Sequence, residues 1–229
     1  EMAGGLLQII AYGSEDMYLT NDPQITFFKV VYRRATNFSI QTFEKTFNDN
    51  PDFGKRGSVK LYRLGDLATK MYLRVVINRI CSYNNKKFAW IRRLGHAIIQ
   101  NIEIKIGGVT IDKHYGTWLD VWYELTGANS EGYEKMIGDT DELTEFNSLD
   151  KPEYTLYIPL QFWFNRFIGL SVPLIALQYH DVYLHIEFEK VNKLIISDGK
   201  FDSSCISMKD ATVLTNYIYL DTEERRRFA

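Results

Sequence analysis

The residues best suited to chemistry in this sequence are its histidines, because an imidazole can bind a metal ion or transfer a proton near neutral pH. His180 and His185 lie close together in the segment QYHDVYLHIEF. They are five positions apart, so on a continuous strand their side chains point to opposite faces of the sheet. A zinc site needs several converging ligands, and His96 and His114 each stand alone in the sequence. We therefore predict no metal site.

Serine and cysteine nucleophiles lack the local sequence that would activate them. The chain has no Gly-x-Ser-x-Gly motif, and Cys205 has no histidine close to it in the sequence. Cys81 and Cys205, the 2 cysteines, are too few for a disulfide scaffold and lack metal-ligand spacing. Their number favours a reducing compartment. Unless the fold brings a distant base to one of these groups, we expect no catalytic residue, no cofactor and no enzymatic activity.

Three short motifs have a structural reading that we prefer to a binding one. Gly107-Gly108 is followed at once by neither a helix nor a Lys-Ser/Thr pair, so it predicts a hairpin turn rather than a phosphate-binding loop. Arg225-Arg226-Arg227 could bind phosphate, but three arginines after two glutamates at a helix start are more typical of an ion-paired or interdomain face. Asn37-Phe38-Ser39 matches the N-glycosylation pattern. We give it little weight, because we expect no secretory signal.

Charge and hydropathy exclude two classes of partner. The chain has 27 basic and 29 acidic side chains, a net charge of -2. A protein that coats nucleic acid usually has a basic excess, so we expect no direct sequence-specific binding of nucleic acid. Residues 159–177 are the candidate membrane span, but Arg166 and Pro173 interrupt it. We predict no transmembrane segment, and instead a buried strand end followed by a short helix.

The pattern of apolar residues indicates a β protein. Aromatic residues make up 14% of the chain, with 15 Tyr and 14 Phe, and these favour strands. The clearest hairpin is IEIKIGGVTI, where apolar residues alternate with Glu103 and Lys105 on a wet face before the Gly107-Gly108 turn. The helix GTWLDVWYELTG follows it, and residues 48–57 and 128–152 read as loops. Strands are expected at residues 25–33, 38–47, 70–78, 102–106, from 109 onward, 153–160, 181–189 and 211–220.

About eight such segments without a βαβ rhythm predict an all-β fold, an eight-stranded antiparallel jelly-roll β-sandwich with short helices in its loops. We place an N-terminal arm at residues 1–24 and the jelly-roll domain at residues 25–220. A helix then starts at Asp221, a good N-cap with Glu224 three residues later. Jelly rolls also serve as carbohydrate-binding, lectin-like modules, which is our alternative function.

Four blocks of the sequence are similar, in the same order, to major capsid proteins of the nucleocytoplasmic large DNA viruses. They cover well over a third of the chain, which is far more specific than a short motif. The blocks are AGGLLQIIAYGSEDMYLTNDPQITFFKVVYRR, IGGVTIDKHYGTWLDVWYEL, PLQFWFNRFIGLSVPLIALQYHDVYLHIEF and YIYLDTEERRRFA.

This resemblance implies a structural virion protein, the first half of a double jelly-roll subunit. It implies a homotrimer with pseudo-hexagonal outline, which packs against neighbouring capsomers to tile an icosahedral capsid. Residues 221–229 would then begin the connector to a second jelly roll, and the arm at residues 1–24 would contact minor capsid proteins. The family further implies assembly in the host cytoplasm and location in the virion.

Overall fold

The computed structural model describes residues 36–82, 86–126, 130–199 and 206–229 of the chain. The predicted arm at residues 1–24 and the predicted strand at residues 25–33 lie outside them. Residues 38–229 form one compact unit, and the description below concerns that unit.

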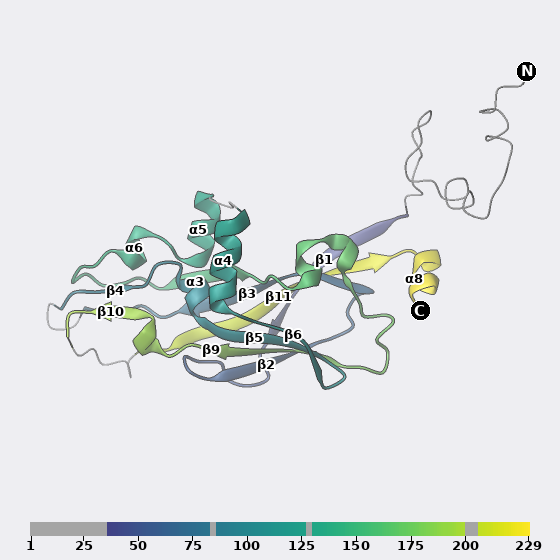
Figure 1. The fold of residues 1–229 in the computed structure, drawn as a ribbon, viewed down its shortest axis with the longest axis horizontal. Helices are drawn as coiled ribbons and strands as arrows, with labels where there is room; N and C mark the ends of the chain where they lie inside the picture. The colour runs from purple at the N-terminus through teal and green to yellow at the C-terminus, as the bar shows by residue number, and fades with distance from the viewer. Residues whose placement is uncertain (1–35, 83–85, 127–129, 200–205) are drawn as a thin grey trace, which may run out of the picture. The chain divides into compact units, whose positions relative to one another are not determined.

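Two antiparallel sheets make up the unit (Figure 1). The first contains, in spatial order, β1 (Phe38–Thr46), β11 (Met208–Leu220), β3 (Leu67–Ile77) and β7 (Tyr154–Pro159), with the short β8 (Val172–Pro173) also on β3. The second contains β2 (Arg56–Leu61), β9 (Val182–Phe188), β5 (Ile99–Ile106) and β6 (Val109–Tyr115). A separate pair joins β4 (Phe88–Trp90) to β10 (Ile195–Ser197).

The strand pairs are nested like one long hairpin that has been wound up. β5 and β6 form the innermost pair, and outward from it β3 pairs with β7, β2 with β9 and β1 with β11, all antiparallel. Winding such a hairpin into two sheets gives the jelly-roll topology. The predicted all-β jelly-roll sandwich is therefore confirmed, with eight principal strands in its two sheets.

The predicted hairpin and the predicted helix after it are both confirmed. Gly107 and Gly108 take φ angles of 59° and 85°, which the two-residue turn between β5 and β6 requires. The helix α4 spans Gly116–Thr126, as the spacing predicted, and it buries Leu119 and Tyr123.

Several elements differ from the prediction. The strands β2, β4, β8 and β10 were missed, and β3 begins at Leu67 rather than at residue 70. The predicted loop 128–152 contains α5 (Glu131–Ile137) and α6 (Asp141–Thr144). The α5 helix is held by its ends: Ser130 accepts a hydrogen bond from the Tyr133 N–H, and Gly138 closes the helix with a φ of 78°. Because both helices are short and mostly polar, they have little apolar periodicity to reveal them.

The core lies between the two sheets and follows the period of two along each strand. On β9 the side chains of Val182, Leu184, Ile186 and Phe188 are buried, as predicted. Each such side chain stabilises the fold by about 1.5–3 kcal/mol. The wet face predicted on β5 is wrong for Glu103, which is only 8% exposed. β5 lies between β9 and β6, and the Glu103 carboxylate accepts a hydrogen bond from Arg56.

The apolar segment at residues 159–177 folds as a strand end and short helices. After β7 come α7 (Trp163–Arg166), the one-turn 3-10 helix η1 (Ile168–Leu170) and the short strand β8. Phe162 and Phe164 are buried in the core, which confirms the predicted buried strand end followed by a short helix. Among the residues that the structure describes, no helix is long and apolar enough to cross a membrane.

Candidate functional site

A group of short helices packs together beside the sandwich and carries a connected set of polar contacts. α3 (Leu94–Ala97), α4 and α5 lie next to one another there (Figure 1). Gly116, the first residue of α4, makes this packing possible: a Cβ at Gly116 would lie 2.2 Å from the carbonyl oxygen of His96 and 2.3 Å from that of Ile99. Only a glycine permits so close an approach of two backbones.

Arg93 is the centre of the polar contacts. Its backbone takes a φ of 51°, and among the described residues it is the non-glycine residue with a positive φ. The guanidinium donates to Asp120 at 2.9 Å, forms an ion pair with Glu124, and stacks over the Tyr123 ring at 4.7 Å from the centroid. These contacts offset the cost of a left-handed conformation, which is about 1–2 kcal/mol.

His96 uses both of its ring nitrogens. Nδ1 lies 3.3 Å from Asp120 Oδ1, and Nε2 lies 3.0 Å from the Tyr133 hydroxyl. Burial lowers the pKa of His96, although Asp120 acts to raise it. With a neutral ring, Nδ1–H donates to Asp120 and Nε2 accepts from Tyr133, so the imidazole is fixed between α4 and α5. Alone in the sequence, His96 has two side-chain partners in the fold.

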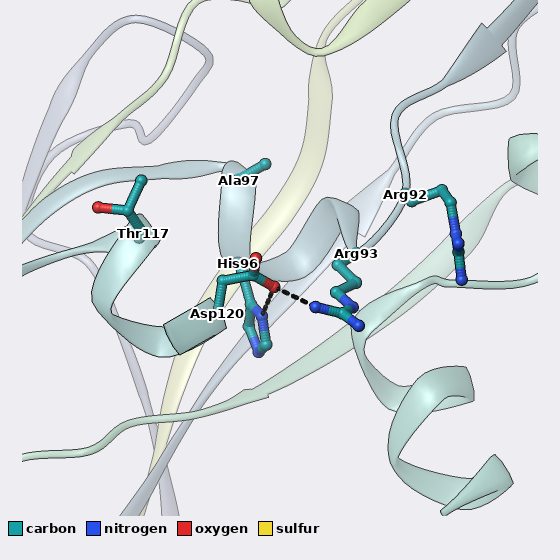
Figure 2. A pocket seen from close by; sticks show the side chains of 7 residues that line it. Arg92, Arg93, His96, Ala97, Thr117 and Asp120 are labelled. Atoms are coloured by element: carbon teal, nitrogen blue, oxygen red, sulfur yellow. Dashed lines mark hydrogen bonds and ion pairs between the residues drawn. The ribbon is translucent and has the colours of Figure 1, made fainter. Parts of the chain in front are cut away.

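Asp120 is the shared acceptor. Burial acts to raise the pKa of its carboxyl, but hydrogen bonds from Arg93 and His96 outweigh burial and hold the pKa below the ordinary value. Figure 2 shows both contacts converging on this carboxylate. The neighbouring Arg92 forms a bidentate pair with Asp139, with both distances 3.2 Å.

A cavity of about 390 Å³ lies beside this network (Figure 2). Its lining residues are Arg92, Arg93, His96, Ala97, Gly116, Thr117 and Asp120. The charged residues that line it are bonded to partners within the chain, and the imidazole has both nitrogens engaged. The arrangement therefore acts as a clamp that holds α3, α4 and α5 together, and it leaves no lining histidine or carboxylate poised as a free base.

The structure does not bring His180 and His185 together. His180 lies in an exposed turn before β9, so the argument from opposite faces of a strand does not apply to it, whereas His185 lies on β9 beside the ring of Tyr183. Within the described part of the chain, no group of three His, Cys, Asp or Glu side chains converges as a metal site would require. Cys81 is free and exposed, and Cys205 lies outside the described residues.

His114 is a buried histidine on β6. Its ring packs against Phe162 with 4.5 Å between centroids, and among the described groups its Nε2 has no hydrogen-bond partner. Burial lowers the pKa of His114 to about 4; Asp112 acts to raise it and Arg166 to lower it further. This imidazole is therefore neutral over the physiological range.

The arginine run lies on α8 (Thr222–Phe228), whose N-cap is Asp221. Arg225 forms an ion pair with Asp66 at 3.1 Å, and Arg227 forms one with Glu224 at 3.3 Å. Both pairs agree with the ion-paired reading of this run. Asp221 accepts from the Thr222 N–H instead of the N–H three residues on, so the predicted capping box is not formed on that side.

Exposed apolar side chains lie on α4 and on the segment that includes η1, with α7 in contact with both elements. Arg166 of α7 stacks on Trp122 at 4.3 Å and lies 5.8 Å from Trp118, which places α4 beside α7, and η1 in turn contacts α7. We define the α4–η1 surface by five apolar side chains that are 48–73% exposed: Val121, Leu125, Phe167, Ile168 and Leu170.

Comparisons with known proteins point in one direction. Residues 26–221 match the family described as the major capsid protein N-terminus. The chain is 47% identical to capsid protein 1 of Acanthamoeba polyphaga mimivirus, covering 100% of this chain and 42% of that protein. It is 46% identical to the major capsid protein of Pyramimonas orientalis virus, covering 100% of this chain and 56% of that protein. It thus spans about half the length of these curated relatives.

Comparison with solved structures also gives matches to viral capsid proteins. The quasi-atomic model of the PBCV-1 virus capsid matches with a TM-score of 0.69 and 32% identity, covering 89% of this chain and 48% of that one. The Faustovirus major capsid protein matches with a TM-score of 0.69 at 10% identity, covering 95% of this chain and 60% of that one. At that identity the second match speaks for the fold alone.

Proposed function

This chain belongs to the major capsid protein family of the nucleocytoplasmic large DNA viruses, matching its N-terminal portion, and from that premise we propose that it is the first jelly roll of a double jelly-roll shell subunit. The observation that carries the proposal is the match to the PBCV-1 capsid, where this fold covers 48% of a capsid chain at 32% identity. A second domain of similar size accounts for the remaining half of such a chain. In this proposal α8 begins the connector between the two domains.

Three such subunits form a trimer with a pseudo-hexagonal outline, and trimers tile an icosahedral shell. The mechanism is geometric, since a rigid sandwich keeps its backbone hydrogen bonds internal and leaves loops free for contacts. Many modest contacts then add up through symmetric repetition. The α4–η1 surface supplies part of the contact between subunits, because its side chains are apolar and exposed and the clamp around Arg93 holds α4 in place.

The remaining parts of the proposal concern partners and location. The arm at residues 1–24 contacts minor capsid proteins, and assembly takes place in the host cytoplasm before the protein resides in the virion. The subunit has no catalytic duty towards a substrate. The carbohydrate-binding alternative is not favoured, because the named relatives are capsid proteins.

Sedimentation and electron microscopy of the full-length capsid product that contains this chain test the proposal. We expect trimers that appear as hexagonal capsomers. A product that stays monomeric at every concentration reached, and forms no capsomer, would overturn it.

A pair of substitutions tests the contact surface. Phe167→Asp places a charge on a side chain that is 63% exposed, so folding should be retained while the association constant of the trimer falls at least about tenfold, corresponding to about 1.4 kcal/mol. The matched control is Ile196→Asp on β10, 56% exposed and outside the α4–η1 surface. If both variants assemble alike, the α4–η1 surface is not part of the contact.

A further inference from the structure

Lys151 is a lysine whose charged end is held inside the protein. The residue is 1% exposed. Its Nζ donates to the main-chain oxygen of Glu145 at 2.7 Å and to Asn147 Oδ1 at 3.1 Å, and it lies 6.0 Å from the centre of the Phe88 ring. These partners are two neutral oxygens and an aromatic face.

Burying the ammonium group of Lys151 costs free energy, because a buried charge loses its hydration and here no opposite charge is in contact to compensate for that loss. Burial accordingly lowers the pKa of Lys151, while the more distant Glu145 carboxylate acts to raise it. The neutral amine is therefore easier to reach here than on the surface, and a neutral lysine amine is a nucleophile.

The side-chain amide of Asn147 is held beside this amine by hydrogen bonds to both its oxygen and its nitrogen. Its Oδ1 accepts from Lys151 and from the Leu149 N–H at 3.1 Å, and its Nδ2 donates to Glu145 Oε2 at 3.0 Å. The carboxylate of Glu145 thus contacts the nitrogen that would leave if the amide were attacked.

The backbone fixes both partners. Asn147 accepts from the Phe88 N–H at 2.9 Å, and Lys151 pairs with Ile80 through two hydrogen bonds of 2.9 and 3.0 Å. Since Nζ is 3.1 Å from Oδ1 and a C=O bond is about 1.23 Å long, Asn147 Cγ lies no more than about 4.3 Å from Nζ. A reacting pair sits about 3–3.5 Å apart, so a shift of about 1 Å brings the amine into attacking range.

We propose that Lys151 and Asn147 join through an intramolecular isopeptide bond that the folded chain forms by itself. Lys151 first gives one proton to solvent water, and its Nζ then attacks Asn147 Cγ to give a tetrahedral centre. Glu145 takes a proton from the attacking nitrogen and delivers it to Nδ2. The Cγ–Nδ2 bond breaks, ammonia leaves and takes up a proton from water to become ammonium, and the new Cγ–Nζ amide remains.

The reaction balances without any other reactant: one ammonium and one primary amide become one secondary amide and one ammonium ion. It needs no oxidant, reductant or cofactor. The reaction is favourable because it removes a buried charge. Its product cross-links the segment between α6 and β7. The step occurs once in each molecule and does not depend on the proposed capsid role.

Intact-mass spectrometry of the purified protein that contains these 229 residues tests the inference. Loss of ammonia predicts a mass about 17 Da below that of the sequence. A succinimide at Asn147-Ser148 would give the same loss, so the protein is also digested with a protease that cuts on the amino side of Asp150. The isopeptide bond keeps the peptide holding Asn147 joined to the peptide holding Lys151, whereas a succinimide leaves them separate.

Variants identify the reacting groups. Lys151→Arg should restore the sequence mass, and Glu145→Gln should slow the appearance of the joined peptides by about 10²-fold or more, the usual contribution of a proton-transfer group. The matched control is Lys135→Arg, an exposed lysine paired with Glu131, which should keep the full mass loss.

Wild-type protein that carries the sequence mass after prolonged incubation, or that releases two separate peptides, would overturn the inference. This result comes from the wild-type chain, so it stands even if a variant fails to fold.

Discussion

Acid should weaken this fold through His114, whose burial lowers its pKa to about 4. In the unfolded chain the same imidazole has an ordinary pKa near 6.5. As the pH falls below 6.5 the unfolded state takes up a proton that the folded state refuses, so the free energy of unfolding decreases. The decrease levels off below pH 4, where both states are protonated.

The magnitude follows from these two pKa values. Linkage gives a loss of about 2 kcal/mol on going from pH 7 to pH 5, and about 3 kcal/mol by pH 4. Burial also lowers the pKa values of His96 and His185, so they add loss in the same direction. The contribution of His114 must therefore be isolated by substitution.

Urea unfolding of the wild type and of His114→Leu, at pH 7 and pH 5, provides the assay. Leucine is similar in size, packs against Phe162 and removes the unpartnered Nε2, so stability at pH 7 should stay within about 1.5 kcal/mol of the wild type. The variant should lose about 2 kcal/mol less than the wild type between the two pH values. The control His180→Leu, at an exposed position, should keep the wild-type loss. Equal losses in wild type and His114→Leu would refute the reasoning.

Two further predictions concern the helices around Arg93. Gly116→Ala places a Cβ 2.2 Å from the His96 carbonyl oxygen, so it should cost about 1–3 kcal/mol in thermal or urea unfolding. The control Gly132→Ala, whose Cβ meets nothing within 4 Å, should be neutral or stabilising, and similar losses in both variants would argue against the close approach. Asp120→Ala removes the acceptor shared by Arg93 and His96 and should cost about 1–2 kcal/mol, checked by urea unfolding. A loss near zero would show that solvent replaces the carboxylate.

The elements that could be predicted from the sequence are those whose local residue pattern already matches the structure they adopt in the fold. Alternation along β9 and the two glycines between β5 and β6 suffice to identify a strand and a hairpin. By contrast, β2 has only Val59 and Leu61 as large buried side chains, and its alternation is too short to stand out. Strand β4 exists because β10 pairs with it from about a hundred residues away, and a single sequence does not reveal that partner.

The candidate site was harder to predict than the fold. Arg93 and Asp120 are 27 positions apart, and they meet only because Gly116 lets α4 approach α3. The dipeptide Arg92-Arg93 before a short helix was the available signal, although it does not identify the acceptors. Lys151 and Asn147 are close in sequence, but the burial that makes their contact chemically interesting depends on the isolated bridges that Ile80 and Phe88 form with them.

The nesting of the strand pairs sets the order in which these pairs can form while the chain is being synthesised. Phe38 of β1 pairs with Leu220 of β11, so 182 residues separate the two. At roughly 5–20 residues per second, a ribosome needs on the order of 10–35 s to make that span. During this time the hairpin of β5 and β6 can already form, while β1 waits with an open edge that another nascent copy could pair with. When many copies are synthesised side by side, a chaperone that covers the open edge of β1, or a low local concentration of nascent chains, therefore favours correct folding until β11 emerges.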